Sequence, residues 1–151
     1  MTLLRIVLKG ALVAGALLLF PGPDARAGDA DAGAKVFKKC QACHSLKAGK
    51  RRTGPSLHGV YGRQAGTFVD SKGKTFRHSK DMKAAGEAGL VWSAEVLAAY
   101  IANPKPYIGA MIGKKKAKTK MVFPGLKKPA DIENLVAFLE PFASGAQEGK
   151  R

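Results

Sequence analysis

The two cysteines of this 151-residue chain stand three positions apart, in the run Cys40-Gln41-Ala42-Cys43-His44. The chain contains no other cysteine, so its fold cannot rest on a framework of disulfide bonds. Cysteines at this spacing near the end of a helix lie on one face, and His44 follows them directly. A chain with this run is expected to fold around the group that the two thiols and the imidazole hold together.

Three kinds of site use cysteines spaced this closely. A thioredoxin-like redox pair accompanies a β-α-β pattern, which this sequence lacks. Half a zinc site needs two further ligands, for which His58 and His78 are the obvious candidates. The order C-x-x-C-H is the attachment signature of c-type haem, in which both thiols add to vinyl groups of one porphyrin and the histidine lies under the iron. We therefore expect one haem c, attached to Cys40 and Cys43 by two thioether bonds.

The N-terminal residues have the composition of a secretory signal peptide. Arg5 and Lys9 precede an apolar run over residues 10–20, and the small residues Ala25-Arg26-Ala27 provide a cleavage site. We expect a mature N-terminus at Gly28 and export to the periplasm. The apolar run is shorter than the roughly 20 residues that span a bilayer, so stable membrane insertion is not expected.

Residues 28–151 are expected to form a single domain once residues 1–27 are removed. The whole chain has a net charge of +15, and the mature part keeps +13 because the leader contains three basic residues and one acidic residue. Such a basic chain would suggest nucleic acid as a partner, but an exported protein does not meet the genome. Acidic proteins or anionic lipid head groups remain as the expected partners.

Helical signals dominate the mature sequence. Apolar spacing and capping residues predict three main helices, over 29–43, over 93–103 and over 132–141, where Pro141 is expected to end the helix. A short helical turn at 81–85, closed by Gly86, is expected before the second of these. No strand-like alternation of useful length occurs. The sequence therefore predicts an all-α fold whose long loops need a large apolar group to wrap.

Further residues follow in a characteristic order. They are Gly28-Asp-Ala-Asp-Ala-Gly33, K-V-F-K-K-C-Q-A-C-H, Thr53-Gly-Pro-Ser-Leu-His-Gly59, Gly62-Arg63, Trp92, Tyr100, Asn103-Pro104, Thr119-Lys-Met121 and Phe123-Pro-Gly125. With this series the chain resembles class I cytochromes c over residues 28–143. The pattern A-G-L-V-W ending at Trp92 is similar to the bacterial cytochrome c2 type, which is close to mitochondrial cytochrome c. The resemblance implies the class I cytochrome c fold, with about three main helices, short helices and long loops around one covalently bound haem. It also implies that Gly33 and Phe37 pack against Leu135 and Phe138 where the terminal helices cross.

The resemblance implies a set of haem contacts as well. His44 and Met121 would be the axial ligands, and the carbonyl of Pro55 would accept a hydrogen bond from Nδ1–H of His44. Arg63 and Trp92 would face a haem propionate. The remaining expected contacts are Tyr100 and Thr119, near the Met121 sulfur or the other propionate, and Phe123.

Two features depart from the family pattern. His78 stands where relatives usually carry a propionate-bonding tyrosine. The segment 108–118 is longer than in the mitochondrial relatives and contains Met111, a second possible thioether ligand. Met82, on the expected short helix, is a third. We favour Met121, because it lies in the T-K-M-x-F-x-G pattern of the ligand loop and a lone methionine is more often core filler.

By the same resemblance, a ring of lysines surrounds the exposed haem edge and docks acidic partners. The expected members are Lys39, Lys105, Lys120, Lys127 and Lys128, extended by Lys114, Lys115, Lys116 and Lys118.

The resemblance implies a soluble, monomeric one-electron carrier of the periplasm, without catalytic residues and without a nucleic-acid partner. Its acidic redox partners would be a cytochrome bc1 complex, a photosynthetic reaction centre, a terminal oxidase or a periplasmic dehydrogenase. One alternative is a haem enzyme or gas-binding cytochrome, such as a peroxidase, in which the sixth position of the iron is open. Another is a fixed electron-transfer subunit of a dehydrogenase or oxidase, whose permanent partner would cover much of its surface.

Mass spectrometry of the denatured, purified protein tests attachment and processing together. We expect the mass of a chain that begins at Gly28 with one haem added. Release of the haem by acid-acetone extraction would contradict attachment through Cys40 and Cys43, and retention of residues 1–27 would contradict the signal peptide.

Overall fold

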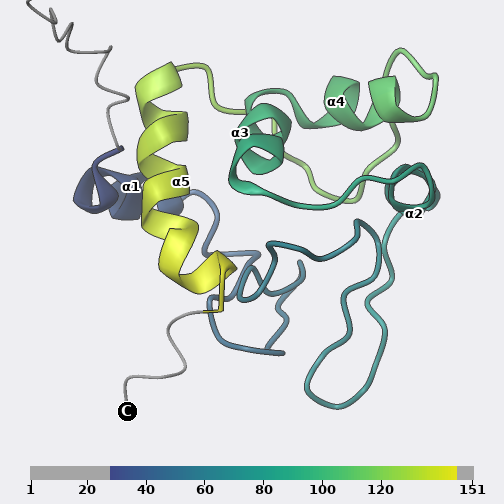
Figure 1. Cartoon of the computed structure of the whole chain (residues 1–151), viewed down its shortest axis with the longest axis horizontal. Coiled ribbons are helices and arrows are strands. Elements are labelled where there is room, and N and C mark those ends of the chain that lie inside the picture. The colour runs from purple at the N-terminus through teal and green to yellow at the C-terminus, as the bar shows by residue number, and fades with distance from the viewer. Residues whose placement is uncertain (1–27, 146–151) are drawn as a thin grey trace, which may run out of the picture.

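The computed structural model describes residues 28–145, and their regular structure is helical. The helices are α1 (Ala30–Phe37), α2 (Lys80–Glu87), α3 (Ala94–Ala102), α4 (Pro104–Met111) and α5 (Pro129–Ala143). Within these described residues, β-pairing is limited to two isolated bridges, Gln64 with Val91 and Val69 with Thr75. Long loops join the helices and fill one half of the molecule (Figure 1). The expected all-α fold, with helices and long loops, is confirmed.

Helix α1 leads directly into the cysteine run. Its N-cap Asp29 accepts hydrogen bonds from the backbone N–H groups of Asp31 and Ala32, which satisfies two of the free donors at the helix start. Regular α-helix ends at Phe37, earlier than the expected 43. Turns continue beyond it, with Cys40 N–H donating to Phe37 O at 2.7 Å and His44 N–H donating to Cys40 O at 2.9 Å. The chain therefore keeps helix-like bonding through the cysteine run.

The two terminal helices cross closely at one side of the molecule (Figure 1). Gly33 lies against the backbone of Asn134, where an added Cβ would overlap the Asn134 carbonyl oxygen and lie 2.7 Å from the Phe138 Cβ. The rings of Phe37 and Phe138 pack with centroids 5.3 Å apart. The N–H of Asp29 donates to the side-chain oxygen of Asn134 at 2.7 Å, which pins the start of α1 to α5.

Helix α5 continues past Pro141 to Ala143, so the expectation that Pro141 ends it is wrong. The proline removes one donor from the last turn. The loop that follows Ser56 bonds to this last turn, with Gly59 N–H donating to Phe142 O and Tyr61 N–H donating to Ala143 O, at 2.9 and 3.0 Å. Tertiary hydrogen bonds thus hold the helix end that local sequence would have terminated.

Helices α2 to α4 also refine the sequence expectations. Gly86 does not close α2 but is buried inside it, against the carbonyl of Ala65, and α2 runs to Glu87. Helix α3 ends before Asn103 as expected. Sequence analysis missed α4, which begins at Pro104 immediately after the α3 cap. The proline that stops one helix is well suited to the first position of the next, because its missing N–H has no partner there anyway.

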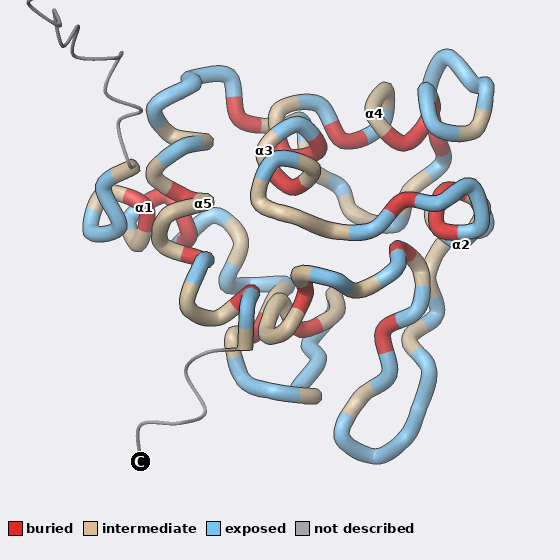
Figure 2. The backbone as a smooth tube through the Cα atoms, in the orientation of Figure 1, coloured by how far each residue is buried: buried red, intermediate tan, exposed pale blue. Residues whose placement is uncertain are grey.

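The buried residues surround the centre of the molecule and are contributed by both helices and loops (Figure 2). Ser56 shows how the loop after His44 is ordered: its fully buried hydroxyl bonds to Lys47 O at 2.7 Å and accepts from His58 N–H at 3.1 Å. Among the described residues, no helix combines the length and the apolar character needed to cross a membrane.

Substituting Gly33 by alanine tests the close crossing of α1 and α5. The added methyl group would overlap the Asn134 backbone, and overpacking of this kind costs about 1–3 kcal/mol of unfolding free energy. Denaturant unfolding of Gly33→Ala should show this loss. The exposed neighbour Lys35→Ala should stay within about 0.5 kcal/mol of the parent protein. Equal stability of Gly33→Ala and the parent would contradict the crossing.

Candidate functional site

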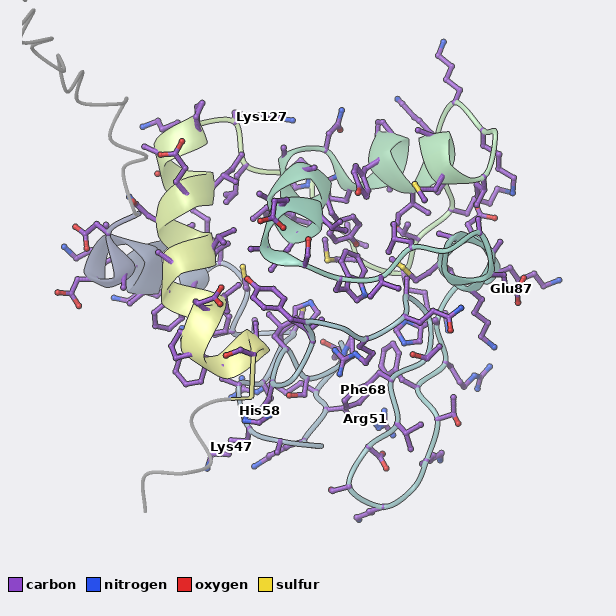
Figure 3. The ribbon with its side chains drawn as sticks, viewed as in Figure 1. Lys47, Arg51, His58, Phe68, Glu87 and Lys127 are labelled. Atoms are coloured by element: carbon purple, nitrogen blue, oxygen red, sulfur yellow. The ribbon has the colours of Figure 1, made fainter. Side chains whose placement is uncertain are left out.

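A central cavity of about 490 Å³ brings the expected site residues together. Its size is in the range of roughly 300–1,000 Å³ that is common for small-molecule and cofactor sites. The lining comes from the cysteine run, the loops between residues 53 and 79, helices α2, α3 and α5, and the segment 119–123. Apolar side chains form much of the wall, among them Val60, Phe68, Leu97, Leu135 and Leu139. Figure 3 labels Phe68, one of the side chains that line this cavity.

Cys40 and Cys43 both line the cavity and are free thiols. Cys40 is half-buried and Cys43 is exposed. Burial raises the pKa of the Cys40 thiol, partly offset by the positive charge of Lys39, with a further small rise from Cys43. Both sulfurs thus lie at one edge of an apolar cavity, where they can add to two substituents of a single flat group.

His44 also lines the cavity, and its ring is fixed from behind. Its Nδ1 lies 2.8 Å from the carbonyl oxygen of Pro55, so Nδ1–H donates and Nε2 keeps its lone pair. Burial lowers the pKa of His44, although the bond to Pro55 opposes this shift. Gly54 packs on the ring so closely that an added Cβ would lie 2.7 Å from His44 Cε1. The imidazole is therefore neutral, oriented and available as a metal ligand.

Met121 lies on the cavity wall together with Phe123. The hydroxyl of Tyr100 lies 3.7 Å from the Met121 sulfur, and the hydroxyl of Thr119 lies 3.3 Å from the Met121 carbonyl oxygen. Burial raises the pKa of Tyr100 to about 12, so its hydroxyl stays protonated and donates toward the sulfur. Trp92 lines the cavity too and packs edge-on against Tyr100, with centroids 5.0 Å apart.

The other two methionines differ in their placement. Met111, on α4, is 37% exposed and does not line the cavity. Met82, on α2, does line it. Sequence reasoning treated Met82 as filler, because the local pattern of a short helix does not say which of its faces meets a cavity formed by distant segments.

Positive charge gathers at one part of the cavity wall, around Arg63 and His78. Arg63 donates to Ser56 O at 2.9 Å and stacks 5.0 Å from the centroid of Phe68, and burial lowers its pKa to about 10. Burial, together with the charges of Arg63, Lys83 and Lys120, lowers the pKa of His78 to about 4. Nε2 of His78 is buried without a hydrogen-bond partner among the described residues.

These residues fit a haem. The two thiols suit its vinyl groups, the neutral imidazole and the thioether suit its iron, and the apolar walls suit its ring. The cations and the unpartnered His78 nitrogen suit its carboxylates, because a buried polar atom without a partner is costly. Zinc fits less well, since no group of three or more His, Cys, Asp or Glu side chains in residues 28–145 is arranged to hold a metal ion.

The five expected docking lysines are all exposed, but they lie at different places. Lys39 and Lys120 line the cavity, whereas Lys105, Lys127 and Lys128 do not. Lys39 lies 4.0 Å from Asp131, and Lys127 lies 3.4 Å from the carbonyl oxygen of Ala102. Figure 3 shows Lys127 at the end of the molecule where α5 begins.

Comparison with known proteins gives a consistent result. The family model described as cytochrome c matches residues 30–141. Cytochrome c2 of Afifella marina is 47% identical over 112 residues, which cover 74% of this chain and 80% of the relative. Cytochrome c2 of Cereibacter sphaeroides is 42% identical over 127 residues, 79% of this chain and 84% of the relative. The solved cytochrome c2 of Rhodospirillum centenum superimposes with a TM-score of 0.66 at 38% identity, covering 76% of this chain and 98% of that one.

The contact between Gly54 and His44 can be tested directly. In Gly54→Ala the methyl group would displace the imidazole from its bond to Pro55, so we expect a lower yield of covalently loaded protein and about 1–3 kcal/mol less stability. Haem-stained gels and thermal unfolding measure the two effects. Lys50→Ala, at an exposed position nearby that does not line the cavity, should behave like the parent protein. Normal loading and stability of Gly54→Ala would contradict the packing role of Gly54.

Proposed function

The chain belongs to the cytochrome c family, and from that premise we propose that it is a periplasmic one-electron carrier with His44 and Met121 as axial iron ligands. It carries covalently attached haem c, and it is an electron-transfer protein rather than an enzyme. The haem, when bound, supplies the one-electron redox couple. The single observation that carries the ligand assignment is that His44 and Met121 line the same cavity as Cys40 and Cys43.

Two contacts support the axial ligands. On one side, the bond from Nδ1–H to the Pro55 carbonyl leaves Nε2 of His44 free for iron and makes it more basic. On the other side, the Tyr100 hydroxyl lies close to the Met121 sulfur and restricts its position. If His44 and Met121 both hold the iron, no position would be open for a substrate or a gas. A thioether is a soft ligand and favours the ferrous state.

The propionates are assigned to the positively charged part of the wall. We infer that Arg63 and His78 bond to them and that Trp92 covers one of them. This assignment is supported by the unpartnered Nε2 of His78 and by the field of Arg63, Lys83 and Lys120 around it. Haem carboxylates there would offset like charges that otherwise repel each other.

Export and docking complete the proposal. The signal peptide, residues 1–27, lies outside the described residues, so its support is the sequence pattern alone. The acidic partners would be membrane redox complexes or periplasmic dehydrogenases that approach the cavity edge at Lys39 and Lys120. The high positive charge of the chain favours transient, electrostatically guided complexes over a permanent assembly.

Replacing each methionine in turn identifies the ligand. Met121→Ala should abolish the near-infrared methionine-to-iron band, lower the reduction potential and open the iron to carbon monoxide. Met111→Ala and Met82→Leu should keep the band and exclude carbon monoxide. Met82→Leu is the sharper control, because Met82 also lines the cavity. Loss of the band in Met82→Leu but not in Met121→Ala would show that Met82 on α2, and not Met121, is the iron ligand.

Charge reversal tests docking. Attraction between exposed charges fades over a Debye length of about 10 Å at 0.1 M salt, so steering should weaken as salt is added. In stopped-flow experiments at low salt, Lys39→Glu with Lys120→Glu, both at the cavity edge, should slow electron transfer to an acidic partner about tenfold or more and flatten its salt dependence. The exposed pair Lys72→Glu with Lys74→Glu changes net charge equally, and neither lysine lines the cavity. Equal effects of the two pairs would show that net charge alone steers.

A further inference from the structure

Asp81, in the first turn of α2, directs a carboxylate toward the segment that connects α4 to Met121. We propose that Asp81 is a positioning residue that holds this segment, and with it the Met121 thioether, in place over the cavity. The proposal rests on the proposed function, because it assumes that Met121 ligates the iron.

The carboxylate of Asp81 accepts two short hydrogen bonds. Its Oδ2 accepts the backbone N–H of Lys118 at 2.6 Å, and its Oδ1 accepts from Lys114 Nζ at 2.7 Å. The residue is only 7% exposed, although Lys114 itself reaches into solvent. The bonds from Lys114 and then Lys118 lower the pKa of Asp81, so the carboxylate is ionised near neutral pH. Hydrogen bonds to a charged acceptor are about twice as strong as neutral ones.

The bonds of Asp81 hold the chain just before Met121. Just before Lys118, the segment folds back on α4, where Lys114 N–H bonds to Gly109 O and Ala117 N–H bonds to Lys105 O. From Lys118 to Gly125, no backbone–backbone hydrogen bond occurs in the described structure. The next one joins Leu126 N–H to Ile101 O at 2.9 Å. Met121 thus lies in a span of chain whose backbone is anchored by Asp81 on one side and by α3 on the other.

The same contact also joins helix α2 to the segment after α4. Among the described helix pairs, α2 packs only against α4. Asp81 therefore joins the part of the molecule that carries His78 and Met82 to the part that carries Met121. Loss of the carboxylate should let the span from 118 to 125 move away from the cavity more often, because one of its two backbone anchors is gone.

Imidazole binding to the ferric holoprotein measures this motion. Imidazole can reach the sixth position of the iron only when Met121 leaves it, so its affinity reports how readily the span opens. We expect Asp81→Ala to bind imidazole about tenfold to a hundredfold more tightly than the parent protein, as loss of a hydrogen bond to a charged group predicts. Asp81→Asn keeps one acceptor oxygen for Lys118 N–H and should fall in between. Visible titration and loss of the near-infrared band give the readout.

Asp70 offers a matched control. Its carboxylate also accepts two backbone N–H bonds, from Lys72 and Lys74, and pairs with a cation, Arg51, but neither Asp70 nor these partners line the cavity. Asp70→Asn should lower the stability of the protein without changing imidazole affinity. Lys114→Ala removes the exposed half of the Asp81 contact and keeps the Lys118 bond, so it should raise the affinity only about twofold to threefold.

The outcomes separate this proposal from the proposed function. Tighter imidazole binding by the Asp81 variants, with Asp70→Asn unchanged, supports the positioning role. If Met121→Ala binds imidazole more tightly than the parent while the Asp81 and Asp70 variants behave alike, Met121 ligation stands and the role of Asp81 is overturned. If Met121→Ala and the parent bind imidazole equally, the ligand assignment itself is wrong and the positioning role falls with it.

Discussion

The apolar cavity at the centre of the molecule is the constraint on which the rest of the structure depends. Leu97 of α3, Leu135 of α5 and Phe68 of the long loop all line this cavity, and Leu97 and Leu135 also belong to the hydrophobic core. The described residues contain neither a disulfide nor an extended strand ladder that could order loops of this length. The haem c of a cytochrome c therefore serves as core and as redox centre at once. Attachment through two cysteines suits this double role, because a group that the fold needs cannot dissociate.

The two faces of the cavity are held in different ways. On the His44 side, consecutive turns, the Pro55 bond and the close packing of Gly54 fix the imidazole through short local contacts. On the Met121 side, the backbone is held by hydrogen bonds to distant residues at Lys118 and at Leu126. Under the proposed ligation, the weaker ligand is thus carried by the less constrained segment. The contacts of Asp81 and Tyr100 with this segment compensate for the missing local structure.

Sequence reasoning worked where the signal is local and failed where a distant partner decides. The cysteine run and the Asp29 and Ser93 caps are readable within a few residues, and the family motifs led to the residues that meet at the cavity. The end of α5 could not be predicted from the local sequence, because hydrogen bonds from the N–H groups of Gly59 and Tyr61 stabilise the helix beyond Pro141. Helix α4 was missed because Pro104 was interpreted only as a stop. Nothing near Asp81 in the sequence indicates that Lys118 is its partner.

The surface next to Met121 combines one exposed apolar residue with exposed positive charge, which suits the proposed transient docking. Val122 is 95% exposed and follows Met121, with the exposed Lys120 just before it. An exposed apolar residue offers a contact that excludes water, while neighbouring lysines act over longer distances and mainly raise the rate of encounter. A small apolar contact adds little to the lifetime of a complex. In the proposed role this division is required, because a carrier that bound its acceptor tightly would be slow to return for the next electron.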